Sequence, residues 1–264
     1  MSDFIERLPI AIRIDLGTDL EAAEPTDVAR SLDTRHVTGL LAPLVVRADG
    51  SDVLKRVGLP GYVVQSGDRE ASLLDEAAKL LGLLSDVALN IVNVVTRTIY
   101  WTRPDQGGDA SVEPFASCTF FDMPGATFLT AGAARVLPPQ LVTAQPSAYA
   151  VAEAILHEAL HQLLNREHGG NPLFRPEARG VDVDIPWHGT RWELERAFHT
   201  AFVYAGLAAL RRRAVDRALA PELIALNAVE EAGKSLSSLR ESISAEQHTL
   251  TESGARIWAE ICRD

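Results

Sequence analysis

The sequence has 264 residues, of which 47% are hydrophobic and 23% are charged, and these proportions are ordinary for a soluble globular protein. Its net charge of −11 argues against nucleic acid as a partner, and no apolar run predicts a transmembrane helix. Two widely separated cysteines form no disulfide framework, and the acidic N-terminus lacks the features of a signal peptide. We therefore expect a cytoplasmic protein that binds neither nucleic acid nor a membrane.

Residues 1–110 show mixed patterns of secondary structure and no pattern that indicates chemistry. Within them, residues 69–84 carry leucine and alanine at helical spacing and predict an amphipathic helix. Residues 86–101 are apolar and rich in β-branched side chains, so helix and strand both stay open. We interpret residues 1–110 as a supporting region with room for substrate recognition. Residues 111–264 then form the metal-binding helical region as one compact unit.

Two short strands are predicted at residues 117–121 and 126–130, around a Met-Pro-Gly-Ala turn. Shortly after them, residues 147–168 predict a helix, with Ser147 as its N-cap and two glycines, 169–170, as its stop. The strands and this helix together predict a small antiparallel sheet that packs near a helix.

The predicted helix carries an H-E-x-x-H motif in His157, Glu158 and His161. Residues four apart lie on one face of a helix, about 6 Å apart along its axis, so both imidazoles can bind one metal ion. Glu158 lies about 100° around the helix, where it can contact a group on the metal without binding the metal itself. Two histidines in so apolar a helix are costly unless something satisfies them, which favours a metal site over a chance match.

A third ligand is needed. Leu164 and Glu167 stand where the metzincin continuation would have Gly and His, so that interpretation fails. A second helix is predicted at residues 190–213, opened by a capping box at residues 190–193. Near its middle, His199 lies among aromatic residues and is the preferred ligand, while Glu195, one turn earlier, is the alternative.

Between the two helices, residues 169–189 form a loop of the length that active-site lids often have. Three arginines, Arg175, Arg179 and Arg191, are candidate partners for a carboxylate, because a guanidinium binds carboxylates in a bidentate manner. For Arg175 and Arg179, a solvated loop is the simpler interpretation. For Arg191, predicted in the first turn of the second helix, we favour a role in the site.

The chain after Arg213 predicts amphipathic helices divided near residues 242–245. Their charged faces are most simply solvated surfaces that cover the core or pair two protomers in a homodimer.

The order of these features resembles a known family. A Pro-Gly before a short strand, the H-E-x-x-H helix, a Trp-x-x-x-Arg segment from Trp187 to Arg191, and His199 eight residues later are similar to the HExxH motif-containing peptide-modification proteins. The resemblance covers roughly residues 115–210. It implies hydroxylation of a side chain in a ribosomally synthesised precursor peptide, dependent on iron(II) and 2-oxoglutarate. It also implies that His157, His161 and His199 are the metal ligands and that Arg191 binds the cosubstrate carboxylate.

The main alternative is a zinc-dependent metallopeptidase, in which Glu158 is the general base for an attacking water. A dioxygenase needs a cation for the far carboxylate of 2-oxoglutarate, whereas a peptidase does not. Imidazole ligands suit zinc and iron alike, so the residues leave the metal open. For either activity we predict an α+β fold, mostly helical, with a zincin-like HExxH helix and not a double-stranded β-helix. In zincin-like folds the strand just before this helix borders the cleft, and its free edge can pair with an extended peptide.

Overall fold

The computed structural model describes residues 4–11, 33–36, 44–47, 51–65, 67–105, 115–139 and 141–263. Helices predominate and short strands form small sheets, so the fold is α+β and mostly helical, as predicted. The chain divides into two compact units: unit 1 is Met1–Asp15 with Leu163–Asp264, and unit 2 is Leu16–Gln162. The predicted division at residue 110 concerned the roles of the two parts and stays a prediction.

Unit 2 is built on a six-stranded sheet in the order β1-β2-β4-β6-β5, with β3 paired to β4. The strands are β1 Asp33–His36, β2 Leu44–Arg47, β3 Tyr62–Val64, β4 Thr98–Pro104, β5 Ser117–Thr119 and β6 Ala126–Leu129. The pairs β2–β4 and β4–β6 are parallel and the others antiparallel, so the expectation of a small antiparallel sheet is wrong. The antiparallel pairs β1–β2 and β5–β6 are local in sequence, whereas the parallel pairs join strands that lie far apart in the chain. Parallel pairs need long crossover connections, which local patterns do not reveal.

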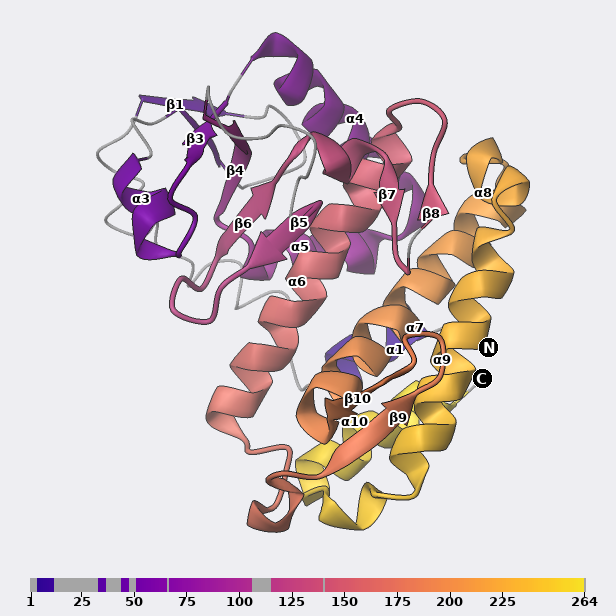
Figure 1. The fold of residues 1–264 in the computed structure, drawn as a ribbon. Helices are drawn as coiled ribbons and strands as arrows, with labels where there is room; N and C mark the ends of the chain where they lie inside the picture. The colour runs from indigo at the N-terminus through magenta and orange to yellow at the C-terminus, as the bar shows by residue number, and fades with distance from the viewer. Residues whose placement is uncertain are drawn as a thin grey trace. The chain divides into compact units, whose positions relative to one another are not determined.

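The helices beside this sheet in the described part of unit 2 (Figure 1) are α3 Ser51–Arg56, α4 Asp68–Leu84, α5 Asp86–Val95 and the first part of α6 Ala148–Gly170. The amphipathic helix predicted at residues 69–84 is confirmed by α4. Residues 86–101, for which helix and strand both stayed open, contain both, since α5 is followed by the start of β4. A short hairpin, β7 Val136–Leu137 with β8 Leu141–Val142, follows a 3-10 turn at Ala131–Ala134 and leads into α6.

Alternation along the strands sends side chains to the two faces of the sheet. On one face, Leu54 of α3 packs with Tyr100, Ala126 and Phe128 in a buried cluster, where the rings of Tyr100 and Phe128 stack with centroids 4.9 Å apart. On the other face, Thr127 contacts α6. The sheet therefore presents a polar side chain toward the H-E-x-x-H helix and an aromatic cluster away from it.

Unit 1 is a helical assembly around α7 Leu194–Asp216, whose residues are buried on most sides. Its other elements are α1 Phe4–Ala11, the end of α6, a 3-10 turn Pro176–Ala178, β9 Asp182–Ile185, β10 Thr190–Glu193, α8 Pro221–Ala225, α9 Ala228–Ser244, a 3-10 turn Gln247–Thr249 and α10 Glu252–Cys262. Phe198 of α7 packs against Phe174 and Trp258, and Phe202 packs edge-on against Phe4 of α1.

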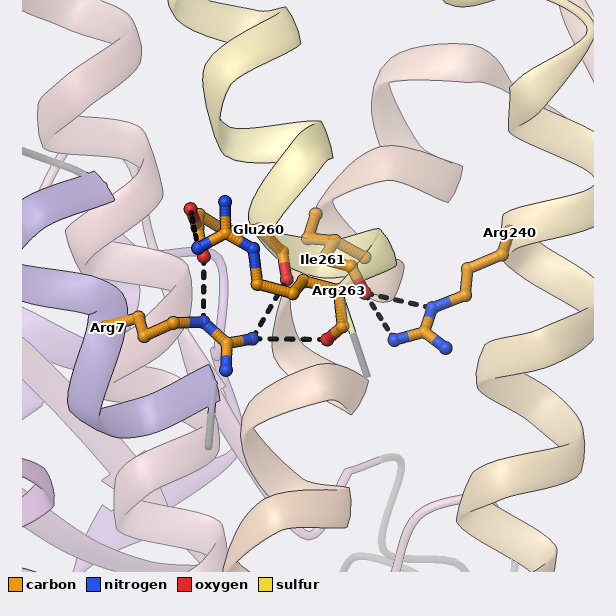
Figure 2. Close-up of polar contacts among 5 residues, drawn as sticks. All are labelled: Arg7, Arg240, Glu260, Ile261 and Arg263. Atoms are coloured by element: carbon orange, nitrogen blue, oxygen red, sulfur yellow. Dashed lines mark hydrogen bonds and ion pairs between the residues drawn. The ribbon is translucent and has the colours of Figure 1, made fainter. Parts of the chain in front are cut away.

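Helix α1 is fastened to the C-terminal helix by an arginine (Figure 2). Nε of Arg7 donates to Oε2 of Glu260 at 2.7 Å, and its Nη2 donates to the carbonyls of Glu260 and Arg263. From α9, Nε of Arg240 donates to the Ile261 carbonyl at 2.9 Å. These guanidinium groups donate to carbonyls at the end of α10, where helical hydrogen bonding runs out.

The predicted start of the second helix, at residue 190, is wrong. Residues Thr190–Glu193 form strand β10, antiparallel to β9, and α7 begins at Leu194 with no side-chain cap from Glu193. The capping-box pattern is overridden because β9 supplies a strand partner, and because a turn with Gly189 at φ +63° closes the hairpin. Within the described parts of the chain, no helix combines the length and the apolarity that crossing a membrane requires.

Candidate functional site

Helix α6 carries the motif as predicted, and its start is capped by Ser147. The Ser147 hydroxyl accepts hydrogen bonds from the backbone N–H of Tyr149 at 3.1 Å and of Ala150 at 3.4 Å. The alanine, leucine and isoleucine residues between Ala150 and Leu160 are almost completely buried. The motif therefore lies on a rigid element, which favours a defined geometry for its side chains.

The two motif histidines converge on one point. Nε2 of His157 and Nε2 of His161 are 3.2 Å apart. Two nitrogen ligands of a single ion, each at about 2.1 Å, are separated by roughly 3.0–3.4 Å for octahedral to tetrahedral angles. Burial, together with the neighbouring His157, lowers the pKa of His161 to about 3, so its imidazole is neutral near pH 7. A neutral imidazole is the form that binds a metal. The pair therefore fits two ligands of one zinc or iron ion.

Glu158 is buried beside this pair, with only 3% of its surface exposed. Its Oε1 accepts a hydrogen bond from the Ser117 hydroxyl at 2.7 Å and lies 3.9 Å from Nε2 of His157. Burial raises the pKa of Glu158 to about 7, although the bond from Ser117 opposes that rise. Near neutral pH this carboxyl can therefore either accept a proton or donate one.

Ser117 is a site residue that the sequence analysis missed. It lies on β5, and Cys118, next along the strand, packs on the opposite face against the aromatic cluster. Burial, with a smaller contribution from Glu158, raises the pKa of the Cys118 thiol to about 12. The signal that could have identified Ser117 is the alternation of small polar and apolar side chains in Ser-Cys-Thr-Phe, which places Ser117 on one face.

The strand edge beside Glu158 belongs to β5. Among the strands that the structure describes, β5 pairs only with β6, whereas β6 lies between β4 and β5. The analogy with zincin-like folds assigned the free edge to the strand just before the helix, residues 126–130. That assignment is wrong because both edges of β6 are paired, and β5 provides the edge next to Ser117 and Glu158.

The predicted third ligand, His199, is a half-buried residue of α7 next to the buried Phe198. It belongs to unit 1, whereas His157 and His161 belong to unit 2. The alternative ligand, Glu195, is exposed on the same helix. No group of three or more His, Cys, Asp or Glu side chains within the described ranges is arranged to hold a metal ion. The histidine pair is therefore present, and the third ligand stays a prediction.

Arg191 lies on strand β10, so its predicted place in the first turn of a helix is wrong. Its Nη2 donates to the Asp182 carbonyl at 2.8 Å, and its Nε lies 3.4 Å from Oδ1 of Asp184. The Arg191 side chain is 63% exposed and that of Asp184 is 82% exposed. Arg175 and Arg179 are exposed loop residues, as their simpler interpretation predicted.

The loop residues Trp187 and His188 form an aromatic group with Trp192 of β10. The rings of Trp187 and Trp192 meet edge-on with centroids 6.3 Å apart, and His188 lies 4.9 Å from Trp192. The guanidinium of Arg196 covers Trp192 at 4.2 Å from the ring centroid. Trp192 therefore already has a cationic partner from its own chain.

Neither a model of a known protein family nor a curated protein sequence matches the chain. The resemblance to the HExxH peptide-modification proteins accordingly rests on the residues of the chain alone.

Proposed function

We propose that this chain is a cytoplasmic enzyme that hydroxylates a side chain of a ribosomally synthesised precursor peptide, with iron(II) and 2-oxoglutarate as cofactors. The convergence of the His157 and His161 nitrogens at 3.2 Å, beside the buried Glu158, is the observation that carries the metal-dependent part of this proposal. Iron(II), when bound, would supply oxidation of a C–H bond by dioxygen, coupled to conversion of 2-oxoglutarate to succinate and carbon dioxide. The choice of iron and 2-oxoglutarate rests on the resemblance.

The residues have distinct roles in this proposal. His157 and His161 hold the metal, and His199 is the proposed third ligand. The edge of β5 next to Ser117 offers backbone N–H and C=O groups with which an extended peptide can form strand hydrogen bonds. Glu158, held by Ser117, would then orient the peptide by a hydrogen bond, because its carboxyl lies beside that edge.

Arg191 is the proposed partner for the far carboxylate of 2-oxoglutarate. Its contact with Asp184 does not prevent this role, because an ion pair between side chains that are 63% and 82% exposed contributes about 0–1 kcal/mol at most. A dicarboxylate that engages both arms of the guanidinium would exceed that contribution. Arg191 can therefore exchange Asp184 for the cosubstrate at little cost.

A zinc-dependent peptidase is the second candidate, and the state of Glu158 favours it. A general base is most efficient when its pKa lies near the working pH, and the pKa of Glu158 is raised to about 7. Zinc, when bound, would lower the pKa of a water that attacks the peptide carbonyl. Glu158 would take the proton from that water, and this activity requires no cation such as Arg191.

One experiment separates the two candidates. The protein is purified without oxygen, its metal content is measured, and it is incubated with candidate precursor peptides, iron(II) and 2-oxoglutarate. The hydroxylase predicts a product heavier by one oxygen atom, with succinate formed in equal amount. Arg191→Lys should weaken 2-oxoglutarate binding by tenfold or more, on the order of 1.4 kcal/mol. The matched control Arg179→Lys, another exposed arginine, should leave it unchanged. Zinc-dependent cleavage of the peptide that is indifferent to 2-oxoglutarate and lost in Glu158→Gln would establish the peptidase instead.

A further inference from the structure

Gln162, the residue after the second motif histidine, makes a set of buried hydrogen bonds to the sheet of unit 2. Its Oε1 accepts from the backbone N–H of Gly125 at 2.8 Å, and its Nε2 donates to the Thr127 hydroxyl at 3.0 Å. Nε2 also lies 3.5 Å from the carbonyl of Ala126. Gln162 is 7% exposed and is the last residue of α6 that belongs to unit 2. Its amide thus attaches the motif helix to this sheet.

The position that Gln162 holds is itself rigid. Gly125 has φ +86°, and its carbonyl accepts from the N–H groups of Arg97 at 2.7 Å and Thr98 at 3.0 Å. A Cβ on Gly125 would lie 2.9 Å from Cγ of Arg97, so only glycine fits there without displacement. The Pro-Gly turn therefore presents a fixed N–H to Gln162.

Gln162 and Glu158 are one turn apart and about 40° apart around α6, so both face β5 and β6. The histidine pair lies about 100° around the helix from them. At a side-chain radius of about 6 Å, a rotation of α6 by about 10° displaces a ring nitrogen by about 1 Å. A metal or catalytic site tolerates about 0.5 Å. The rotation of α6 about its axis therefore decides where the histidine nitrogens point.

Apolar packing and hydrogen bonds both hold this rotation. Of the nine buried residues between Tyr149 and Glu158, three are alanines, Ala150, Ala152 and Ala154, whose methyl groups interlock less with neighbours than larger side chains do. Hydrogen bonds are directional and lose strength when the helix turns. We propose that Gln162 is a positioning residue, which fixes the rotation of α6 against the Pro-Gly turn and β6 and so aims His157 and His161. This inference deepens the proposed function and rests on it only where metal binding is concerned.

The variant Gln162→Met tests the inference, because methionine keeps the length and apolar volume of the side chain and removes both polar atoms. Thr127→Val removes only one hydrogen-bond partner of Gln162, the Thr127 hydroxyl, and so provides a milder variant should Gln162→Met fail to fold. Thr127→Ser keeps the hydroxyl and is the matched control for Thr127→Val. Leu74→Ala, a buried truncation in α4 of the same unit, controls for loss of stability alone.

The first measurement uses metal-free protein and records the ¹⁵N NMR signals of the imidazoles of His157 and His161. We expect both to shift and broaden in Gln162→Met, to shift less in Thr127→Val, and to keep their wild-type positions in Thr127→Ser and Leu74→Ala. Wild-type imidazole signals in both Gln162→Met and Thr127→Val would overturn the inference and leave Gln162 as a residue that only stabilises the fold.

The second measurement is titration with cobalt(II), whose visible spectrum reports the geometry of its ligands. Groups that orient metal ligands typically change metal affinity by 10–100-fold when removed, and we expect a loss of this size in Gln162→Met. A loss no greater than that of Leu74→Ala would contradict the inference. If the wild-type protein binds no cobalt, the proposed function fails at its metal, and the imidazole signals still decide the role of Gln162.

Discussion

Replacing Glu158 by glutamine should stabilise the metal-free protein, and more so at high pH than at low pH. Glutamine has the shape of glutamate, and its Oε1 can still accept the bond from Ser117. The exchange removes a negative charge from a position that is only 3% exposed. Burying a carboxylate with one hydrogen-bond donor costs stability whenever the group is ionised.

The magnitude follows from the pKa of Glu158, which burial raises from 4.5 to about 7 in the folded state. In this range the folded chain holds a proton that the unfolded chain has released, so the free energy of unfolding falls as the pH rises. The loss begins near pH 4.5 and is complete above about pH 7. Between pH 5 and pH 8 it amounts to roughly 2–3 kcal/mol, at about 1.4 kcal/mol for each pKa unit. In Glu158→Gln this pH-dependent fall in the free energy of unfolding is absent, because glutamine does not ionise.

Urea denaturation in the presence of a chelator, followed by circular dichroism at pH 5 and pH 8, measures the effect. The free energy of unfolding of Glu158→Gln, relative to wild type, should be higher at pH 8 than at pH 5 by the amount given above. Glu76→Gln, at an exposed position of α4, should change it by less than about 0.5 kcal/mol at either pH. A variant that is destabilised at pH 8, or a difference that does not depend on pH, would refute the reasoning.

Two further predictions use matched positions. Gly125→Ala should destabilise the protein by about 1–3 kcal/mol, because φ is +86° and the new Cβ would lie 2.9 Å from Cγ of Arg97. Gly233→Ala, in α9 with nothing within 4 Å, should stabilise it by about 0.5–1 kcal/mol, so the two should move the melting temperature in opposite directions. Iodoacetamide at pH 8 should alkylate the exposed Cys262 about 10³-fold faster than Cys118, whose pKa burial raises to about 12. Peptide mapping checks this, and equal rates would contradict it.

The H-E-x-x-H helix was predictable because its signals are local. A serine cap, an unbroken run of good helix formers and a pair of terminal glycines placed it at residues 147–168, and α6 spans Ala148–Gly170. The β5–β6 hairpin was predictable for the same reason, since the turn that joins the strands is written in consecutive residues. Features whose determinants lie within about twenty residues of one another were therefore the ones that the sequence supplied.

The start of α7 was not predictable in this way. The pattern Thr-Arg-Trp-Glu fits a capping box, yet these four residues pair with Asp182–Ile185 and form a strand. The local preference of these residues for a helix start competes with pairing to β9. The strand pairing prevails because it satisfies the hydrogen-bonding groups of the whole backbone segment. Because of this error, Arg191 was predicted on a helix, whereas it lies in the β9–β10 hairpin.

Ser117 and Gln162 escaped prediction because their roles arise from contacts between β5, β6 and α6. A serine in a short strand and a glutamine after a histidine are individually unremarked in a sequence. Only the fold brings Ser117 to Glu158, 41 residues away, and Gly125 to Gln162, 37 residues away. Polar contacts between residues far apart in the sequence therefore cannot be predicted from either residue alone.

Burying the ionisable side chains of the H-E-x-x-H motif destabilises the metal-free fold, and this loss of stability points to a functional role for the motif. Leu156, Ala159 and Leu160 are fully buried and apolar and lie on the side of α6 away from the motif side chains, so this packing does not require the motif. The motif carries a carboxyl whose pKa is raised to about 7 and an imidazole whose pKa is lowered to about 3, both displaced by burial. Each displacement is a loss of stability in the metal-free chain over part of the pH range. A metal ion bound by both imidazoles would reverse that loss, because it binds the folded site and not the unfolded chain. Groups that destabilise a fold and can be stabilised by a ligand mark a candidate site of function, and the ligand that we propose here is a metal cation.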